Sequence, residues 1–199
     1  SKGNRANTCN NHLKNIKTQF NFAISHNLMK ENPAKNCRKV EVNDAKKKSA
    51  LSPEEYKTFM AIAEMKYPHY YPIYYTFIHT GLRFTELIKL KWQDIDFDNK
   101  VLWIMKPKCK KQPDYVSMHD SLIRILEDLK KNSKSEYAFT DKNGEPFGFR
   151  TRKIIRRLKN VLKTANIASI STVHELRHTH CSYLFNIGLN TREVMEQMR

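Results

Sequence analysis

The seven residues HELRHTH, from His174 to His180, combine side chains at spacings that could do chemistry. His174, Glu175 and His178 match the pattern HExxH, in which two histidines one helical turn apart bind zinc and the glutamate acts as a base. His174 and Arg177 also match HxxR, in which an imidazole and a guanidinium on one helix face can both donate to a phosphate group. The same stretch therefore predicts either a zinc site or a phosphate site.

The surrounding sequence favours the phosphate site. Arg177 would point a permanent cation toward a metal bound by His174 and His178. No glycine turn with a later histidine follows, and Glu193 and Glu196 are conceivable third zinc ligands without being evidence for one. The zinc interpretation is the weaker of the two, although the HxxR pattern alone also occurs as an ordinary surface pair.

The charge of the chain is strongly positive. There are 36 Lys and Arg against 20 Asp and Glu, a net charge of +16, and the pI is near 9.7. Half of the excess lies in the first 50 residues, which hold 11 basic and 3 acidic side chains. This positive charge favours a polyanionic partner, and nucleic acid is the commonest one inside a cell. A merely soluble basic surface is the alternative.

Composition and segment lengths exclude several protein classes. No apolar run approaches the length of a membrane span, and the first residues, SKGNRANTCNNHLK, lack the apolar centre of a signal peptide. Four scattered cysteines without a CxxC pair indicate neither a zinc knuckle nor a disulfide framework. We therefore expect a cytoplasmic protein with reduced thiols and no membrane partner.

Periodicity predicts a mainly α-helical fold with a small antiparallel β-sheet. An amphipathic helix is expected over 8–30, and a lysine-rich linker follows it. We place residues 1–46 in a first domain with its linker and residues 50–199 in a second. Further predicted helices lie over 70–80, 83–90, 122–129 and 149–163, and predicted strands over 92–97, 101–105 and 115–118. Local stop and start signals are Ser52 with Pro53 and Glu55, Gly81, and the N-cap residues Ser171 and Thr172.

The predicted helix over 149–163 is basic along one whole side. That side carries seven positive charges and no acid: Arg150, Arg152, Lys153, Arg156, Arg157, Lys159 and Lys163. A solvated helix face usually mixes signs, so we interpret this one as a phosphate-contacting surface over a merely solvated one. The first five of these residues are the predicted DNA contacts.

Three stretches together resemble the tyrosine recombinases, the phage-integrase family of DNA strand-exchange enzymes. TGLRFTEL with the following KLKWQDID is similar to the first arginine box, and HELRHTHCSYLFNIGLNTREVMEQM is similar to the second. Between them, KPKCKKQPDYVSM resembles the loop that carries the active-site lysine. Upstream, ISHNLMKENPA and LSPEEY resemble the end of the family's core DNA-binding domain and the start of its catalytic domain. The resemblance spans essentially the whole chain.

The resemblance implies a role for each matching residue. Arg83 and Arg177 would bind the non-bridging oxygens of the phosphate that is cut, and His174 would hydrogen-bond it and assist proton transfer. Lys108 would protonate the leaving 5′ oxygen, with Lys106, Lys110 and Lys111 as alternatives. Glu86 would orient Arg83, although a plain surface pair is an open alternative. His178 and His180 would be structural. These assignments require no metal and no cofactor.

The family's nucleophile is a tyrosine that stores the broken bond as a 3′-phosphotyrosine. In the family it lies beyond the second arginine box, so we expect it after Arg199 and expect none of the nine tyrosines here to replace it. The chain is then expected to be a fragment, shortened also at its start. It would bind DNA without cutting it.

The partners implied are a double-stranded DNA recombination site and, for the parent protein, three further copies in a tetramer from a phage or other mobile element. Accessory DNA-bending proteins are also compatible with the resemblance. Two other functions stay open at this point. One is a non-enzymatic DNA-binding regulator with the recombinase fold, and the remote one is a zinc protease.

Overall fold

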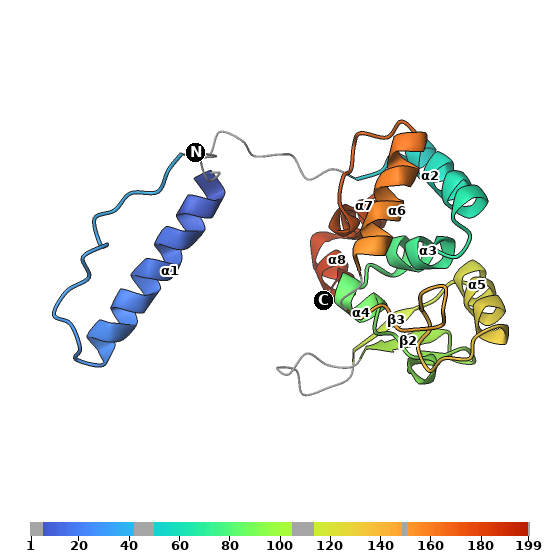
Figure 1. The fold of residues 1–199 in the computed structure, drawn as a ribbon, viewed down its shortest axis with the longest axis horizontal. Helices are drawn as coiled ribbons and strands as arrows, with labels where there is room; N and C mark the ends of the chain where they lie inside the picture. Colours follow the sequence, from blue (N-terminus) through green and yellow to red (C-terminus); the bar gives the residue numbers. More distant parts are fainter. Residues whose placement is uncertain (1–5, 42–49, 105–113, 149–150, 199) are drawn as a thin grey trace. The chain divides into compact units, whose positions relative to one another are not determined.

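Figure 1 shows a computed structural model of the chain, which describes residues 6–41, 50–104, 114–148 and 151–198. The chain divides into two compact units, Ser1–Lys47 and Lys48–Arg199. The predicted linker falls largely outside the described residues. That the first unit is the end of a core DNA-binding domain, and the second a catalytic domain, stays a prediction.

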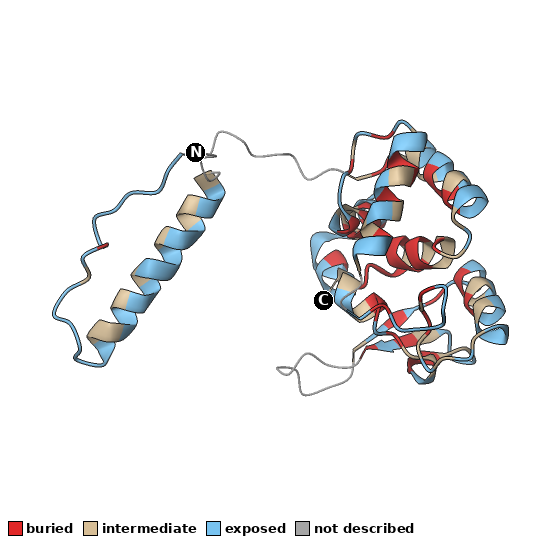
Figure 2. Cartoon of the chain, in the orientation of Figure 1, coloured by how far each residue is buried: buried red, intermediate tan, exposed pale blue. Residues whose placement is uncertain are grey.

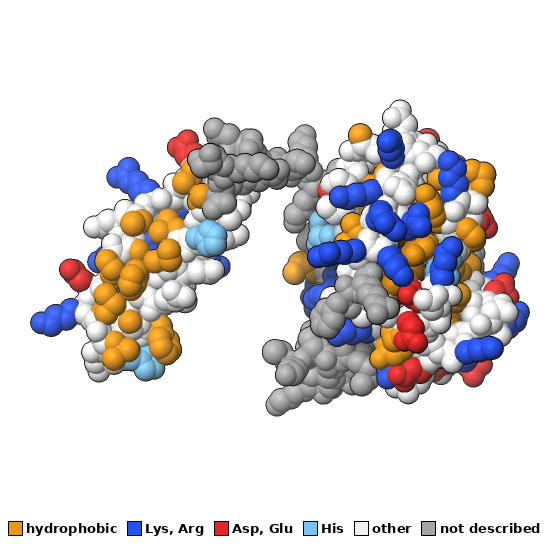
Figure 3. All heavy atoms as spheres, viewed as in Figure 1, with side chains coloured by type: hydrophobic (Ala, Val, Ile, Leu, Met, Phe, Trp, Pro, Cys, Tyr) orange, Lys and Arg blue, Asp and Glu red, His pale blue; other side chains and the backbone are white. Residues whose placement is uncertain are grey.

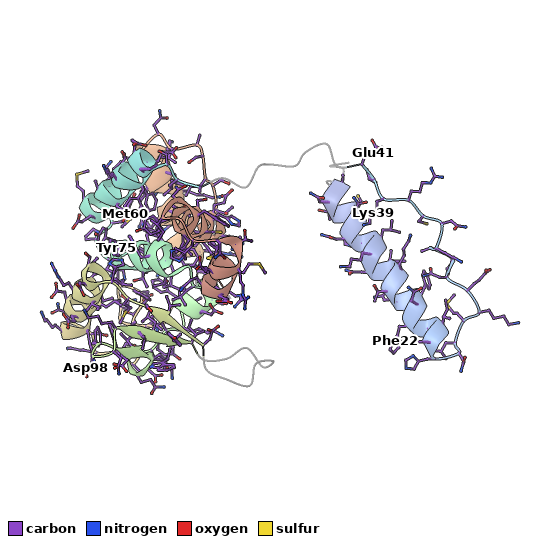
Figure 4. The ribbon with its side chains drawn as sticks, turned by 180° about the vertical axis from the view of Figure 1, so that it is seen from behind. Phe22, Lys39, Glu41, Met60, Tyr75 and Asp98 are labelled. Carbon is purple, nitrogen blue, oxygen red and sulfur yellow. The ribbon has the colours of Figure 1, made fainter. Side chains whose placement is uncertain are left out.

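The described residues of the first unit form α1 (Ala6–Ser25) and an extended segment that returns beside it (Figure 4). The Lys17 Nζ atom donates to two backbone carbonyls of this segment, at 3.0 and 2.8 Å. Asn10 forms two hydrogen bonds of 2.8 Å with the backbone of Val40. No residue of α1 is buried, and Phe22 is 61% exposed. Polar contacts thus hold this unit together.

The end of α1 corrects the predicted helix over 8–30. The helix ends at Ser25, and Asn27 follows with φ 58°. The amides of Asn27 and Leu28 donate to the carbonyls of Ile24 and Ala23, at 3.0 and 2.9 Å. This is the Schellman pattern, in which a left-handed residue closes a helix. Asparagine tolerates that conformation, so the helix stops before the Asn-Pro pair.

The second unit is mainly helical. Its helices are α2 (Pro53–Lys66), α3 (Tyr71–Thr80), α4 (Phe84–Leu87), α5 (Asp120–Lys131), α6 (Arg152–Thr164), α7 (Val173–Asn186) and α8 (Thr191–Met198). The predicted start of α2 is confirmed: Ser52 and Glu55 form a capping box, in which each side chain bonds the other's backbone amide. Within the described ranges, no helix has the length and apolarity needed to span a bilayer.

One apolar core fills the second unit, as the buried stripes in Figure 2 show. Helices α2, α3, α6 and α7 contribute side chains that are fully inaccessible to solvent, among them Phe59, Phe77, Leu158 and Leu176. The buried Tyr74 hydroxyl donates to the carbonyl of Ile154 at 2.9 Å and ties α3 to α6. Because α3 also packs on α7, the core brings the two arginine boxes together.

A three-stranded antiparallel sheet lies at one end of the second unit, next to α5 (Figure 1). Its strands are β1 (Ile95–Asp96), β2 (Val101–Ile104) and β3 (Asp114–Ser117) in the order β1-β2-β3. Leu102 pairs with Ile95 on one side and with Val116 on the other. The mainly helical fold with a small antiparallel sheet is therefore confirmed.

Two further elements differ from their prediction. The predicted strand over 92–97 begins as the 3-10 helix η1 (Trp92–Asp94), because the Asp94 carboxylate accepts from the Lys91 amide at 3.2 Å and closes a turn. The predicted helix over 83–90 is only the single turn α4. After it, the Leu90 carbonyl accepts from the Ala138 amide at 2.8 Å, a long-range bond that a continued helix would not form.

Candidate phosphate-binding site

Arg83 is the N-cap of α4 and is held by Glu86. The Arg83 backbone amide donates to Glu86 Oε2 at 2.7 Å, and its Nη1 donates to Glu86 Oε1 at 2.9 Å. The Glu86 side chain is 15% exposed and that of Arg83 is 50% exposed. The spacing of three residues therefore produces the expected ion pair, in which a shielded carboxylate holds an accessible guanidinium. Its use in catalysis stays a prediction.

Arg177 is buried, with 8% of its surface exposed. Its Nη1 donates to the carbonyl of Gly81 and its Nη2 to the carbonyl of Met198. Burial and then repulsion from Arg83 lower the pKa of the Arg177 guanidinium from its ordinary value, while Glu86 opposes that shift. The two box arginines are thus close enough to repel each other, and arginine keeps its proton in proteins.

Gly81 connects the two arginines through the backbone. It ends α3 in the left-handed conformation, with φ 58°, and its amide donates to the Phe77 carbonyl at 3.1 Å. This turn aims the Gly81 carbonyl at Arg177 and starts the short path to Arg83, two residues later. The predicted helix stop therefore also builds the site.

Glu175 serves the start of α7 and not a metal site. Its Oε2 atom accepts from the backbone amides of Ser171 and Thr172, at 2.7 and 2.6 Å, and from both hydroxyls. Burial alone would raise the pKa of Glu175, but these hydrogen bonds outweigh it and lower that pKa. A carboxylate with four donors is poorly suited to act as the base of a zinc protease.

His174 and His178 lie on successive turns of α7, with ring centroids 4.9 Å apart. His174 is exposed at the first turn, beside backbone amides that favour anions. Across residues 6–41, 50–104, 114–148 and 151–198, no group of three or more His, Cys, Asp or Glu side chains could hold a metal ion. Lys108 and its alternatives Lys106, Lys110 and Lys111 lie outside the described residues, so their assignment is untested.

Comparison with known proteins shows the family of the chain. The model of the phage integrase family matches residues 49–199, which is more than half of the chain. The chain belongs to the phage integrase family. Its relatives include integrases, transposon proteins and tyrosine recombinases. The predicted membership in the tyrosine recombinases is confirmed.

Two relatives illustrate the extent of the match. The ICEBs1 integrase of Bacillus subtilis is 25% identical over 95% of this chain and 57% of its own length. The tyrosine recombinase XerC of Bacillus pumilus is 28% identical over 98% of this chain and 67% of its own length. This chain therefore spans little more than half of the first relative.

Solved structures share the fold at lower identity. The Tn1549 transposon integrase in complex with circular intermediate DNA superposes with a TM-score of 0.82 at 23% identity, covering 99% of this chain and 72% of the other. A lambda integrase tetramer bound to a Holliday junction gives a TM-score of 0.76 at 18% identity, covering 98% and 59%. These likenesses concern the fold alone.

The basic helix of the integrase chain is α6. Arg152, Lys153, Arg156 and Lys159 are exposed on it, and together with Ile155 they line an open hollow of about 550 Å³. Figure 3 shows Lys and Arg side chains gathered over this face. Lys153 also reaches the buried Asp141 carboxylate at 3.3 Å.

Two predicted contacts on α6 differ from that pattern. The Arg157 guanidinium lies over the Tyr67 ring, 5.1 Å from its centre, so one face of it is occupied by protein. Arg150 lies outside the described residues. Among the four predicted contacts that the structure describes, Arg152 and Arg156 are therefore the best placed for an external phosphate.

Sequence inspection missed a cluster of aromatic rings beside the Gly81 turn. The His79 Nε2 atom lies 2.7 Å from the Tyr56 hydroxyl, and the His79 ring packs on Tyr75 and His119 with centroids 4.3 and 4.7 Å apart. Figure 4 labels Tyr75 within α3. The members come from α2, α3 and the N-cap of α5, so no sequence spacing could reveal them.

We expect this cluster to make the integrase chain sensitive to acid. Burial, followed by repulsion from His119 and His180, lowers the pKa of His79 from 6.5 to about 4. Between pH 6.5 and 4, His79 binds a proton in the unfolded chain but stays neutral in the folded chain. The free energy of unfolding therefore falls as the pH drops through this range. The expected loss is about 3 kcal/mol.

The measurement is the free energy of unfolding by urea at pH 7, 5.5 and 4 for the unsubstituted chain and for His79→Phe. This free energy should fall less with pH in His79→Phe. The control is His12→Phe, at an exposed position of α1, which should behave like the unsubstituted chain. Parallel curves for all three proteins would contradict the assignment.

Proposed function

We propose that this chain binds double-stranded DNA as part of a protein that performs site-specific recombination by cutting and rejoining DNA. The chemistry would pass through a 3′-phosphotyrosine in the parent protein. The observation that carries the proposal is the hydrogen bond from Arg177 to the Gly81 carbonyl, two residues before Arg83, with only neutral carbonyls accepting from the buried guanidinium among the described residues. Two like charges near the same turn favour an anion between them.

The two arginines would bind the non-bridging oxygens of one phosphodiester. A guanidinium has five N–H donors. The hydrogen bonds of Arg177 to Gly81 and Met198 use two of these five, one on Nη1 and one on Nη2. The remaining donors are fixed in direction before any substrate arrives. Fixed donors stabilise the added charge of a pentacoordinate transition state without reorganising, which is how such sites accelerate phosphoryl transfer.

His174 and Lys108 would complete the proton transfers. His174 is exposed at the start of α7, three residues before Arg177, so both can face one phosphate. Lys108 would act as the general acid on the leaving 5′ oxygen. Glu86 would keep Arg83 in place through its bidentate contact.

The exposed basic side chains of α6 would contact the phosphate backbone away from the reacting centre. Arg152, Arg156 and Lys159 share one solvent-facing side. Such contacts position a protein on DNA without reading its sequence. For the parent protein we propose a tetramer on paired sites, supported by the lambda integrase tetramer that shares this fold.

None of the tyrosines is proposed as the nucleophile. The hydroxyls of Tyr56 and Tyr74 bond His79 and the Ile154 carbonyl inside the core. Tyr183 is exposed on α7, but it follows Arg177 by six residues, which turns the helix by about 240° to another face. We therefore propose that this chain binds DNA without forming a covalent adduct.

The contribution of α6 can be measured through salt. We expect Arg152→Ala with Arg156→Ala to weaken binding to a short duplex equally for unrelated sequences. The slope of log K against log salt should become shallower by about 2, because each lost phosphate contact removes about 0.9. Fluorescence anisotropy titrations between low and moderate salt give the slope.

A matched control is Arg124→Ala, which removes an exposed arginine from α5, a helix of mixed charge. It should leave the slope unchanged. An unchanged slope in the α6 double variant, or an equal change in Arg124→Ala, would remove α6 from the DNA interface.

The absence of a nucleophile is tested with suicide duplexes that trap cut DNA on a recombinase. We expect a complex on native gels and no band of increased mass under denaturing conditions, since none of the tyrosines is proposed as the nucleophile. A denaturation-resistant adduct that disappears in one tyrosine-to-phenylalanine variant would overturn this part of the proposal. Absence of a complex on native gels would instead overturn DNA binding itself.

A further inference from the structure

His180 lies on the same side of α7 as Arg177. The two residues are three apart in the helix, and both are buried, with 7% and 8% of their surfaces exposed. Arg177 is one of the two arginines proposed to bind phosphate. His180 has no part in that chemistry, and the sequence predicted a structural role for it.

The His180 ring is packed directly on Gly81. A methyl group placed on the Gly81 Cα would overlap the His180 Cδ2 atom and would lie 3.2 Å from its Cγ and Nε2 atoms. No side chain larger than hydrogen therefore fits between the ring and the backbone at this point. The φ of 58° at Gly81 disfavours other residues independently.

Arg177 contacts the same residue, Gly81, through its carbonyl group. The Gly81 carbonyl accepts from Arg177 Nη1, while the His180 ring presses on the Gly81 Cα. Two residues of α7 thus grip one turn at the end of α3. The turn cannot move away from His180 without also carrying the carbonyl away from the guanidinium.

We propose that His180 is a positioning residue, which sets the direction of the Arg177 guanidinium through the Gly81 peptide. Its flat ring supplies a wall against which the turn rests, and the carbonyl is thereby fixed at the guanidinium edge. The consequence for DNA rests on the proposed function of Arg177. The geometric claim does not.

The geometric claim is tested by NMR of the arginine side chains. Arg177 signals are assigned by their loss in Arg177→Lys, and the rate of rotation about its Nε–Cζ bond is measured. We expect slow rotation in the unsubstituted chain and rotation about tenfold faster in His180→Ala, since the charge-assisted hydrogen bond from Arg177 to Gly81 is lost. His180→Phe, which keeps a flat ring, should retain slow rotation.

Leu184→Ala is the matched control, because Leu184 is buried to a similar degree one turn further along α7. It should lower the unfolding midpoint without changing the rotation of Arg177. If His180→Ala does not fold, His180→Leu, which fills the space without a flat ring, takes its place. Unchanged rotation in His180→Ala, or in His180→Leu where that variant replaces it, would overturn the proposal, and so would equal acceleration in Leu184→Ala.

A second readout connects the geometry to DNA. The loss of duplex affinity caused by His180→Ala should disappear when Arg177 is already replaced by lysine, because both changes then act through one group. Equal losses in the two backgrounds would show a role for His180 that does not pass through Arg177 and would overturn the proposal. Should the chain not bind DNA, the proposed function fails while the rotation measurement still decides the geometric claim.

Discussion

The hydrogen bond from the Arg177 guanidinium to the Gly81 carbonyl is the interaction on which the candidate site depends. It joins the second arginine box, on α7, to the turn that opens the first. Gly81 lies only two residues before Arg83, so this one bond fixes how far apart the two guanidinium groups can lie. The packing of α3 on α7 supplies the rigid frame for it.

The electrostatics of this arrangement favour an anion. Burying a cation is costly unless it is hydrogen-bonded, and Arg177 has two backbone carbonyls but no carboxylate at hydrogen-bond distance among the described residues. Carbonyl dipoles reduce the cost of burial and leave the full charge. Glu86 neutralises part of the Arg83 charge in an ion pair that is partly exposed. A net positive site results, which suits a phosphodiester.

Local features were predictable from the sequence because they depend on neighbouring residues. The capping box at Ser52, the stop at Gly81 and the pairing of Arg83 with Glu86 all follow from spacings of three residues or from a single glycine. The resemblance of the two arginine boxes then carried the family and the fold class.

Long-range features were not predictable in this way. The short α4 ends where Leu90 pairs with Ala138, and Arg177 bonds the carbonyl of Met198, 21 residues later. The zinc pattern misleads because the Glu175 carboxylate accepts hydrogen bonds from the backbone amides at the start of α7. A short sequence motif does not show which hydrogen bonds its side chains form. The role of Lys108 depends on residues outside the described ranges and stays a prediction.

The central claim is that Arg83 and Arg177 bind the same phosphate. Its most direct test is a double-mutant cycle on duplex DNA affinity with Arg83→Lys and Arg177→Lys, which keep the charge and remove the planar fork. We expect the two losses to be coupled by at least about 1 kcal/mol, because contacts to one group are not independent. Losses that add to within about 0.5 kcal/mol would contradict it.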